Sequence, residues 1–140
     1  MGIEQGIKGK TILIIDSRPF YREAEPVLLR DNIFPRFLSD LTIPTDFDLA
    51  GYVEEEAIDG IIAHITSIEM TEIMDRCLTS HLPVVVLLRY FMGGCADDWD
   101  RLVQRWADQT GLPVVEKYGS VESITAQAVG FLKPLFENNS

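Results

Sequence analysis

The sequence predicts an α/β protein, a three-layer doubly wound sandwich around a five-stranded parallel sheet with strand order 2-1-3-4-5. Two observations lead to this prediction. Five short apolar runs alternate with five amphipathic segments along the 140 residues, and the middle runs are apolar at successive positions, which is typical of strands covered on both faces. Because crossovers between parallel strands are right-handed, a doubly wound sheet is the simplest arrangement for such a chain.

The strands are predicted from continuous runs of aliphatic and β-branched residues. They are residues 11–16, 33–39, 60–65, 83–88 and 112–117. The fourth run, "PVVVLL", has the strongest strand character of the five. Pro35 in the second run lacks the amide that a central strand must donate, so this strand is expected at an edge of the sheet.

The first helix is predicted over the segment "FYREAEPVLL". Its apolar face, at helical spacing, consists of Phe20, Ala24, Val27 and Leu28. Pro26 interrupts this segment and removes a backbone hydrogen bond, so we expect the helix to kink or restart there.

The next two helices begin with capping signals. Residues 44–57 start with Thr45 three residues before Asp48, which is close to a capping box, and Thr66 with Glu69 forms a complete one. The helix after Thr66 carries on one face Met70, Ile73, Met74 and Cys77.

The last two helices follow the fourth and fifth strands. Residues 97–109 carry a stripe of Trp99, Leu102, Val103 and Trp106. Ser120 is expected to cap the final helix, which should end near Pro134. Its inward face is predicted to be Val121, Ile124, Ala128, Phe131 and Leu132. No repeat or linker divides the chain, so we expect a polar lead at 1–10 followed by a single domain at 11–137.

The composition excludes some classes of partner. Twelve Lys and Arg face 22 Asp and Glu, a net charge of −10, which argues against nucleic acid because binding it depends on cations. The acidic surface is either simply solvated or recruits a basic partner. No apolar run approaches the roughly 20 residues that a membrane span needs. Cys77 and Cys95 form neither a metal-binding spacing nor a disulfide framework, and both suit a reducing cytoplasm.

A site in a parallel sheet is expected beyond the carboxyl ends of the strands. Those ends carry Asp16, Ser39 or Asp40, His64, Arg89 and Lys117. In the predicted strand order Asp16 and His64 meet at the crevice, and Lys117 reaches them from the far strand. Such a group could transfer a proton or hold an anion. In the structural alternative, Asp16 caps the first helix and pairs with Lys117.

Known phosphate and metal motifs are missing from the sequence. The turn "IIDSRPF" contains no glycine, so its backbone amides are not predicted to cradle a phosphate. A Ca²⁺ or Mg²⁺ site would need a second acid beside Asp16, and the next residue is Ser17. His64 and His81 are the only histidines. We therefore expect no metal and no cofactor.

The segments "TILIID", "AIDGIIAHI", "LPVVVLL" and "LPVVEKYGSVESI" resemble the strands of the receiver domain of bacterial response regulators. The resemblance spans nearly the whole chain. It places Asp16 at a Mg²⁺-binding acid, His64 at the phosphoaccepting aspartate and Lys117 at the lysine that contacts the phosphoryl group. Ser17 stands where the second acid is expected, and Leu88 stands where a switching Ser or Thr is expected.

These departures lead to the predicted function: a non-catalytic signalling module that acts through protein contacts, as phosphorylation-independent pseudo-receivers do. The contact surface is expected at the fourth helix and the loop before it, where Tyr90, Phe91 and Met92 follow the strand, and it could support a homodimer. We expect His64→Asn to preserve the fold.

Two alternatives stay open. In the first, the chain is an enzyme or ligand-binding domain that uses the Asp16/His64/Lys117 crevice. In the second, it is a degenerate nucleotide-binding domain, because "LPVVVLL" and "TGLPVVEKYGS" are similar to the late strands of small GTPases. The segments "AIDGIIAH" and "LPVVVLL" are also similar to parts of sugar-sensing periplasmic-binding-type domains, which are about twice as long as this chain.

Overall fold

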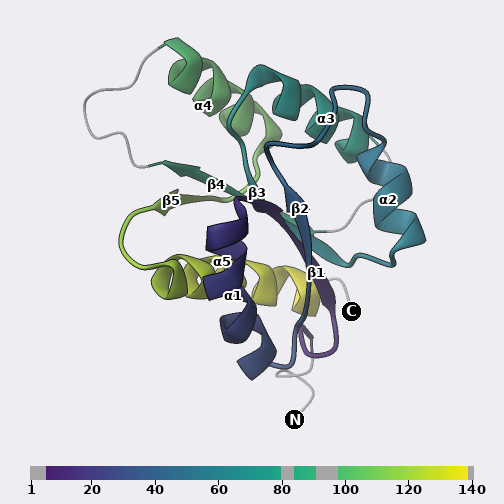
Figure 1. Ribbon diagram of the computed structural model, residues 1–140, viewed down its shortest axis with the longest axis vertical. Coiled ribbons are helices and arrows are strands. Elements are labelled where there is room, and N and C mark those ends of the chain that lie inside the picture. The colour runs from purple at the N-terminus through teal and green to yellow at the C-terminus, as the bar shows by residue number, and fades with distance from the viewer. Residues whose placement is uncertain (1–5, 80–83, 91–97, 139–140) are drawn as a thin grey trace.

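One parallel sheet forms the centre of the protein. The computed structural model describes residues 6–79, 84–90 and 98–138, and its five strands lie in the order β2-β1-β3-β4-β5. Figure 1 shows α1 and α5 on one face of this sheet and α2, α3 and α4 on the other. The predicted fold class and strand order are confirmed.

The elements alternate regularly along the chain. The strands are β1 (Thr11–Asp16), β2 (Phe34–Ser39), β3 (Gly60–His64), β4 (Val84–Tyr90) and β5 (Val114–Lys117). The helices are α1 (Arg18–Arg30), α2 (Leu49–Glu55), α3 (Ile68–Leu78), α4 (Asp98–Thr110) and α5 (Val121–Asn138). The second strand lies at an edge of the sheet, as Pro35 predicted. Within the described residues, every helix is too short or too polar to span a lipid bilayer.

The side chains of β1 show how the two layers are built. Ile12 and Ile14 pack into the core beneath α1 and α5, whereas Leu13 and Ile15 pack into the core beneath α2 and α3. All four are fully buried, and burying each contributes about 1.5–3 kcal/mol. A strand with apolar side chains on both faces therefore belongs in the middle of the sandwich.

The strand register brings the carboxyl ends together. Asp16 lies opposite Ser39 of β2, and His64 lies opposite Leu88 of β4. The fourth strand continues two residues further, to Tyr90, which lies opposite Lys117 of β5. Tyr90 was expected after the end of this strand, and that expectation is wrong. Phe91 and Met92 lie outside the described residues.

The first helix differs from the prediction at its proline. It runs from Arg18 to Arg30 without a restart, with Pro26 inside it. Pro26 is exposed, so water can reach the carbonyl that proline leaves without a donor. The buried side chains of Val27 and Leu28 hold the segment against the sheet.

Two helix caps also differ from the prediction. The hydroxyl of Ser67, rather than that of Thr66, accepts a hydrogen bond from the Met70 amide at 3.2 Å, and α3 begins one residue later. The carboxylate of Asp48 accepts from the Gly51 amide at 3.0 Å, which makes α2 shorter than the predicted segment.

The last helix continues through Pro134 to Asn138, beyond its expected end. Phe131 was predicted to face inward but is 45% exposed. The buried face of α5 instead consists of Ile124, Thr125, Ala128, Val129, Leu132 and Phe136. Phe131 is rotated by about 100° from Leu132 around the helix axis, which turns it towards solvent.

Candidate functional site

Asp16 ends β1 and lies at the centre of a buried group of charged side chains. Its side chain is 1% exposed. The Lys117 ammonium donates to both carboxylate oxygens, at 3.0 and 2.9 Å, and the Ser17 amide donates to Oδ1 at 2.6 Å. The pairing of Asp16 with Lys117 agrees with the structural alternative, but the cap of α1 does not. The Ser17 hydroxyl, not Asp16, accepts from the Phe20 amide.

Lys117 reaches the site from the last residue of β5. Its side chain is 9% exposed, and its ammonium lies 3.4 Å from Nδ1 of His64. The ammonium also lies 4.6 Å from the centre of the Phe20 ring, a favourable position for a cation over an aromatic face. The lysine is thus held by an acid, an imidazole and a ring.

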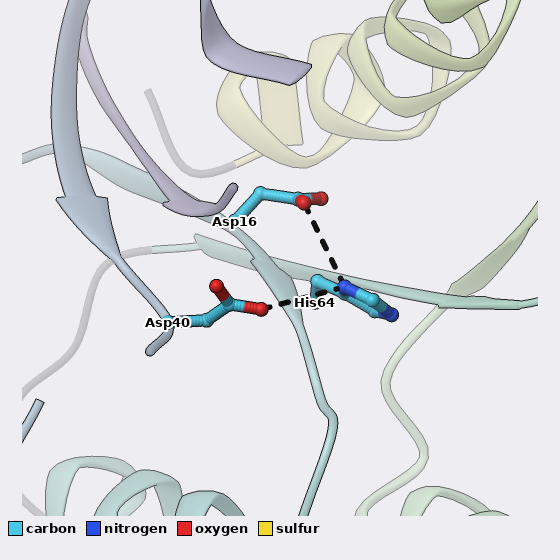
Figure 2. A group of neighbouring side chains, drawn as sticks. All are labelled: Asp16, Asp40 and His64. Atoms are coloured by element: carbon cyan, nitrogen blue, oxygen red, sulfur yellow. Dashed lines mark ion pairs between the residues drawn. The ribbon is translucent and has the colours of Figure 1, made fainter. Parts of the chain in front are cut away.

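His64 ends β3, and it is buried with 2% of its surface exposed. Its Nδ1 lies 3.6 Å from Oδ1 of Asp16 and 3.7 Å from Oδ2 of Asp40. Figure 2 shows the two carboxylates turned towards the imidazole from the neighbouring chain segments. The predicted meeting of Asp16, His64 and Lys117 is therefore present in the structure.

Asp40 is the member of the group that the sequence did not single out. It follows β2 directly, and its amide donates to the Asp16 carbonyl at 3.2 Å. Its side chain is 6% exposed, and Oδ1 is a buried atom with no hydrogen-bond partner among the described residues. The sequence left Ser39 and Asp40 as equal candidates for the end of this strand, because a shift of one residue decides which side chain faces the crevice.

The two carboxylates have opposite electrostatic environments. Burial acts to raise the pKa of Asp16, but hydrogen bonds from His64, Lys117 and the Ser17 amide outweigh it and lower the pKa overall. Burial raises the pKa of Asp40, and the neighbouring charge of Asp16 adds to this, while His64 and Lys117 oppose it. The lysine therefore stabilises one ionised carboxylate much better than the other.

The remaining predicted site residues lie apart from this group. Arg89 was expected at the crevice, but its guanidinium pairs with Glu116 on the adjacent strand at 3.1 Å. Ser17 is close in sequence, yet its hydroxyl is used by the first turn of α1. Leu88 is fully buried in the core. The carboxyl ends of β1, β3 and β5 thus supply three members of the group, and the residue after β2 supplies the fourth.

No model of a known protein family matches this sequence, and no curated protein sequence matches it either. Among solved structures, the chain is similar to a de novo designed Rossmann 2x3 fold protein, with 16% identity, a TM-score of 0.60 and coverage of 90% of each chain. It is also similar to a transcription regulation repressor of the LacI family from Corynebacterium glutamicum, with 16% identity and a TM-score of 0.50. That match covers 99% of this chain and 55% of the repressor.

A flavodoxin-like domain from a Synechococcus species is a further match, with 13% identity and a TM-score of 0.49, covering 90% of this chain and 96% of the domain. At such low identities, the likenesses to the designed protein and to the repressor establish the fold alone. The chain is an α/β protein with the 2-1-3-4-5 strand order of flavodoxin-like doubly wound folds.

Proposed function

We propose that this chain is a receiver-like module that acts through contacts with another protein and is not switched by phosphorylation. The observation that carries the proposal is the buried ion pair between Lys117 and Asp16, whose charged atoms lie 2.9 Å apart. In the receiver resemblance, these two positions serve a phosphoryl group and Mg²⁺. Here each neutralises the other, so this ion pair needs no phosphoryl group to balance its charges.

The environment of His64 supports the same conclusion. The resemblance places His64 at the phosphoacceptor position, where its Nδ1 has two carboxylates within 3.7 Å. A phosphoryl donor is negatively charged, and both carboxylates would repel it. Phosphoryl transfer also needs cations to neutralise the developing charge, and the nearest one, Lys117, is engaged with Asp16.

The proposed contact surface lies on α4, the helix that the sequence analysis favoured. Leu102 on this helix is 44% exposed, although the sequence placed it on the apolar stripe. One turn further along the same stripe, Trp106 anchors the helix to α3, because its indole nitrogen donates to Asp75 at 2.7 Å. Leu102 therefore presents an apolar side chain at a fixed position on α4, and we propose this position as the centre of the contact.

Phosphorylation is tested by incubating the protein with acetyl phosphate and Mg²⁺ and measuring its intact mass. We expect no phosphoryl adduct on the wild type. His64→Asp is also expected to remain unlabelled, because Ser17 still does not provide the second acid for Mg²⁺. A stable phosphoryl adduct on the wild type would overturn the proposal, and strong labelling of His64→Asp would show that the site is a single substitution from receiver chemistry.

The contact surface is tested by affinity capture from the native cytoplasm. We expect the same partner to be captured with and without acetyl phosphate, and to be lost with Leu102→Asp. Leu29→Asp is the matched control, since Leu29 is 50% exposed on α1, on the other face of the sheet. Equal capture by wild type and Leu102→Asp would exclude this surface, and capture that requires the phosphodonor would exclude the phosphorylation-independent function.

A further inference from the structure

We propose that Asp16, Asp40 and His64 form a binding site for a divalent transition-metal ion such as Zn²⁺, and that the ion displaces the Lys117 ammonium. This inference goes beyond the function proposed above and does not depend on it, because it rests on the geometry of the buried group alone.

The distances between the ligand atoms suit a single small ion. Zn²⁺ binds nitrogen and carboxylate oxygen at 2.0–2.2 Å, so two ligand atoms of a tetrahedral site lie about 3.3 Å apart. Nδ1 of His64 lies 3.6 Å from Asp16 and 3.7 Å from Asp40. All three ligand atoms lie within 4.8 Å of one another, so rotating the carboxylates would complete the geometry.

An independent observation points to a missing ligand. Oδ1 of Asp40 is buried and has no hydrogen-bond partner among the described residues, and the whole side chain is 6% exposed. A buried carboxylate oxygen without a partner is costly and rare. Figure 2 shows one oxygen of Asp40, Oδ2, directed at the imidazole of His64, and a rotation of the carboxylate would turn Oδ1 towards a cation shared with these side chains.

The hydrogen-bond requirements of His64 also favour a cation. If Nδ1 carries a proton, it faces both carboxylates well but opposes the ammonium of Lys117 at 3.4 Å. If Nδ1 carries a lone pair, it can accept from the ammonium but opposes the carboxylates. A divalent ion would accept electron pairs from Nδ1 and from both carboxylates at once, so it satisfies all three groups.

The mixture of ligands determines the class of metal. Mg²⁺ requires a nearly ideal octahedron of oxygen atoms and usually keeps several waters, and Ca²⁺ takes six to eight oxygens. One imidazole with two carboxylates suits Zn²⁺, Co²⁺ or Fe²⁺ better, because imidazole is a preferred ligand of these ions. The site would leave a position for water or for an additional ligand.

Lys117 is the internal competitor for this site. Its ammonium binds the same Asp16 oxygen that lies closest to His64, at 3.0 Å. One ammonium supplies a single positive charge to two carboxylates, whereas a divalent ion supplies two. Lys117 is also the most exposed side chain of the buried group, at 9%, so its flexible chain is the part that can swing away when an ion enters.

The binding test uses the full chain without a histidine tag and with Cys95→Ser, which removes a thiol that could bind the metal elsewhere. Co²⁺ is titrated and followed by its visible absorption, and Zn²⁺ is titrated by calorimetry. We expect one equivalent of each metal to bind. Asp40→Asn and His64→Asn should each weaken binding by about 100-fold or more, since losing even an outer-sphere partner costs 10–100-fold.

Two matched controls and one reversed variant make the test specific. Asp46→Asn removes an exposed acid of the nearby loop, and His81→Asn removes the other histidine, which lies outside the described residues. Both should leave the affinity within about twofold. Lys117→Met should bind the metal about tenfold tighter or more, because it removes a positive charge a few ångströms from the ion.

Several outcomes would overturn the proposal. Failure of the wild type to bind either metal would exclude the site, and equal binding by Asp40→Asn and wild type would place the metal elsewhere. Weaker binding by Lys117→Met would contradict the exchange with lysine. If a variant does not fold, paramagnetic Co²⁺ added to the isotope-labelled wild type decides the question, because it must shift or broaden the amide signals of residues 16, 40 and 64 before those of the exposed acids.

Discussion

The two ends of the sheet hold their acids in different ways, because Asp59 at the amino end is partly exposed, whereas the side chains of Asp16 and Asp40 at the carboxyl end are buried. At the amino end, Oδ2 of Asp59 accepts from the Thr11 amide at 2.8 Å, which ties the start of β1 to the segment before β3 with one neutral donor. At the carboxyl end, Asp16 and Asp40 share one ammonium and one imidazole. One backbone amide is enough to join the strands at the amino end. The group of charged side chains at the carboxyl end is therefore larger than is needed to hold the sheet together.

Charges at the amino end otherwise lie in water. A hollow of about 360 Å³ opens there, lined by Ile7, Lys8, Arg30, Asp31, Asn32, Lys133 and Glu137. The ion pair between Arg30 and Glu122 has side chains that are 62% and 68% exposed. Solvent screens such an exposed pair, whereas it screens the buried pair between Asp16 and Lys117 much less, so the two ion pairs contribute differently to stability.

The largest expected effect comes from Lys117→Met. The substitution leaves the Asp16 carboxylate buried without its cation, and we expect a loss of about 3–5 kcal/mol in the free energy of unfolding, measured by urea denaturation. Asp59→Ala is the matched change at the amino end, and it should cost only about 1 kcal/mol because it removes one hydrogen bond. Equal losses at the two ends would remove the distinction between them.

A second prediction concerns the pH dependence of stability. The pKa of Asp40 is raised in the folded state, so its protonation favours folding; this contribution is present below the unfolded pKa and is lost as the pH rises through the folded pKa. Asn mimics the protonated acid. We therefore expect Asp40→Asn to be more stable than wild type at pH 7, with the difference disappearing as the pH falls below the unfolded pKa of aspartate, about 3.9.

The contribution of Asp16 to stability has the opposite pH dependence, because its folded-state pKa is lowered. Its contribution is present above the unfolded pKa and is lost as the pH falls through the folded pKa. Urea denaturation of wild type and Asp40→Asn between pH 3 and pH 7 can thus separate the contributions of the two acids to the free energy of unfolding. If the free energies of unfolding of wild type and Asp40→Asn differed by the same amount at every pH, Asp40 would act through packing and not through its charge.

The smallest expected effect is at the exposed ion pair. Arg30→Gln should change the free energy of unfolding by less than about 0.5 kcal/mol, since exposed pairs contribute little and are screened by salt. The measurement is urea denaturation at low and at high salt. A loss comparable with that of Lys117→Met would mean that exposure does not explain the contrast between the two ends.

Most of the fold could be predicted because the three central strands, β1, β3 and β4, are built around continuous apolar runs. Strands buried on both faces need such runs, and Pro35 correctly placed β2 at an edge. The errors lie where a shift of one residue decides the outcome. Phe131 and Leu132 are adjacent on a helix and equally apolar, and the sequence alone does not say which of them faces the sheet. Ser67 and Thr66 are likewise adjacent, and each carries a hydroxyl that can cap a helix, so the sequence alone does not say which of them does so.

The candidate site was predictable only in part. The strand order brings Asp16, His64 and Lys117 to one edge, and any chain with this topology must do so at these positions. Asp40 could not be chosen from the sequence, because the exact end of β2 depends on its register with β1. Arg89 was misplaced because β4 runs two residues beyond its apolar run, where its side chain pairs with β5.

The pair between Asp16 and Lys117 also has a consequence for the rate of unfolding. It joins residues 101 positions apart, and closing so long a segment of chain is entropically unfavourable until the intervening strands have paired. We therefore expect the contact to form after the folding barrier, so that Lys117→Met leaves the folding rate almost unchanged while it accelerates unfolding. Stopped-flow kinetics should show the whole loss of stability in the unfolding arm, so this pair sets how long the native state lasts.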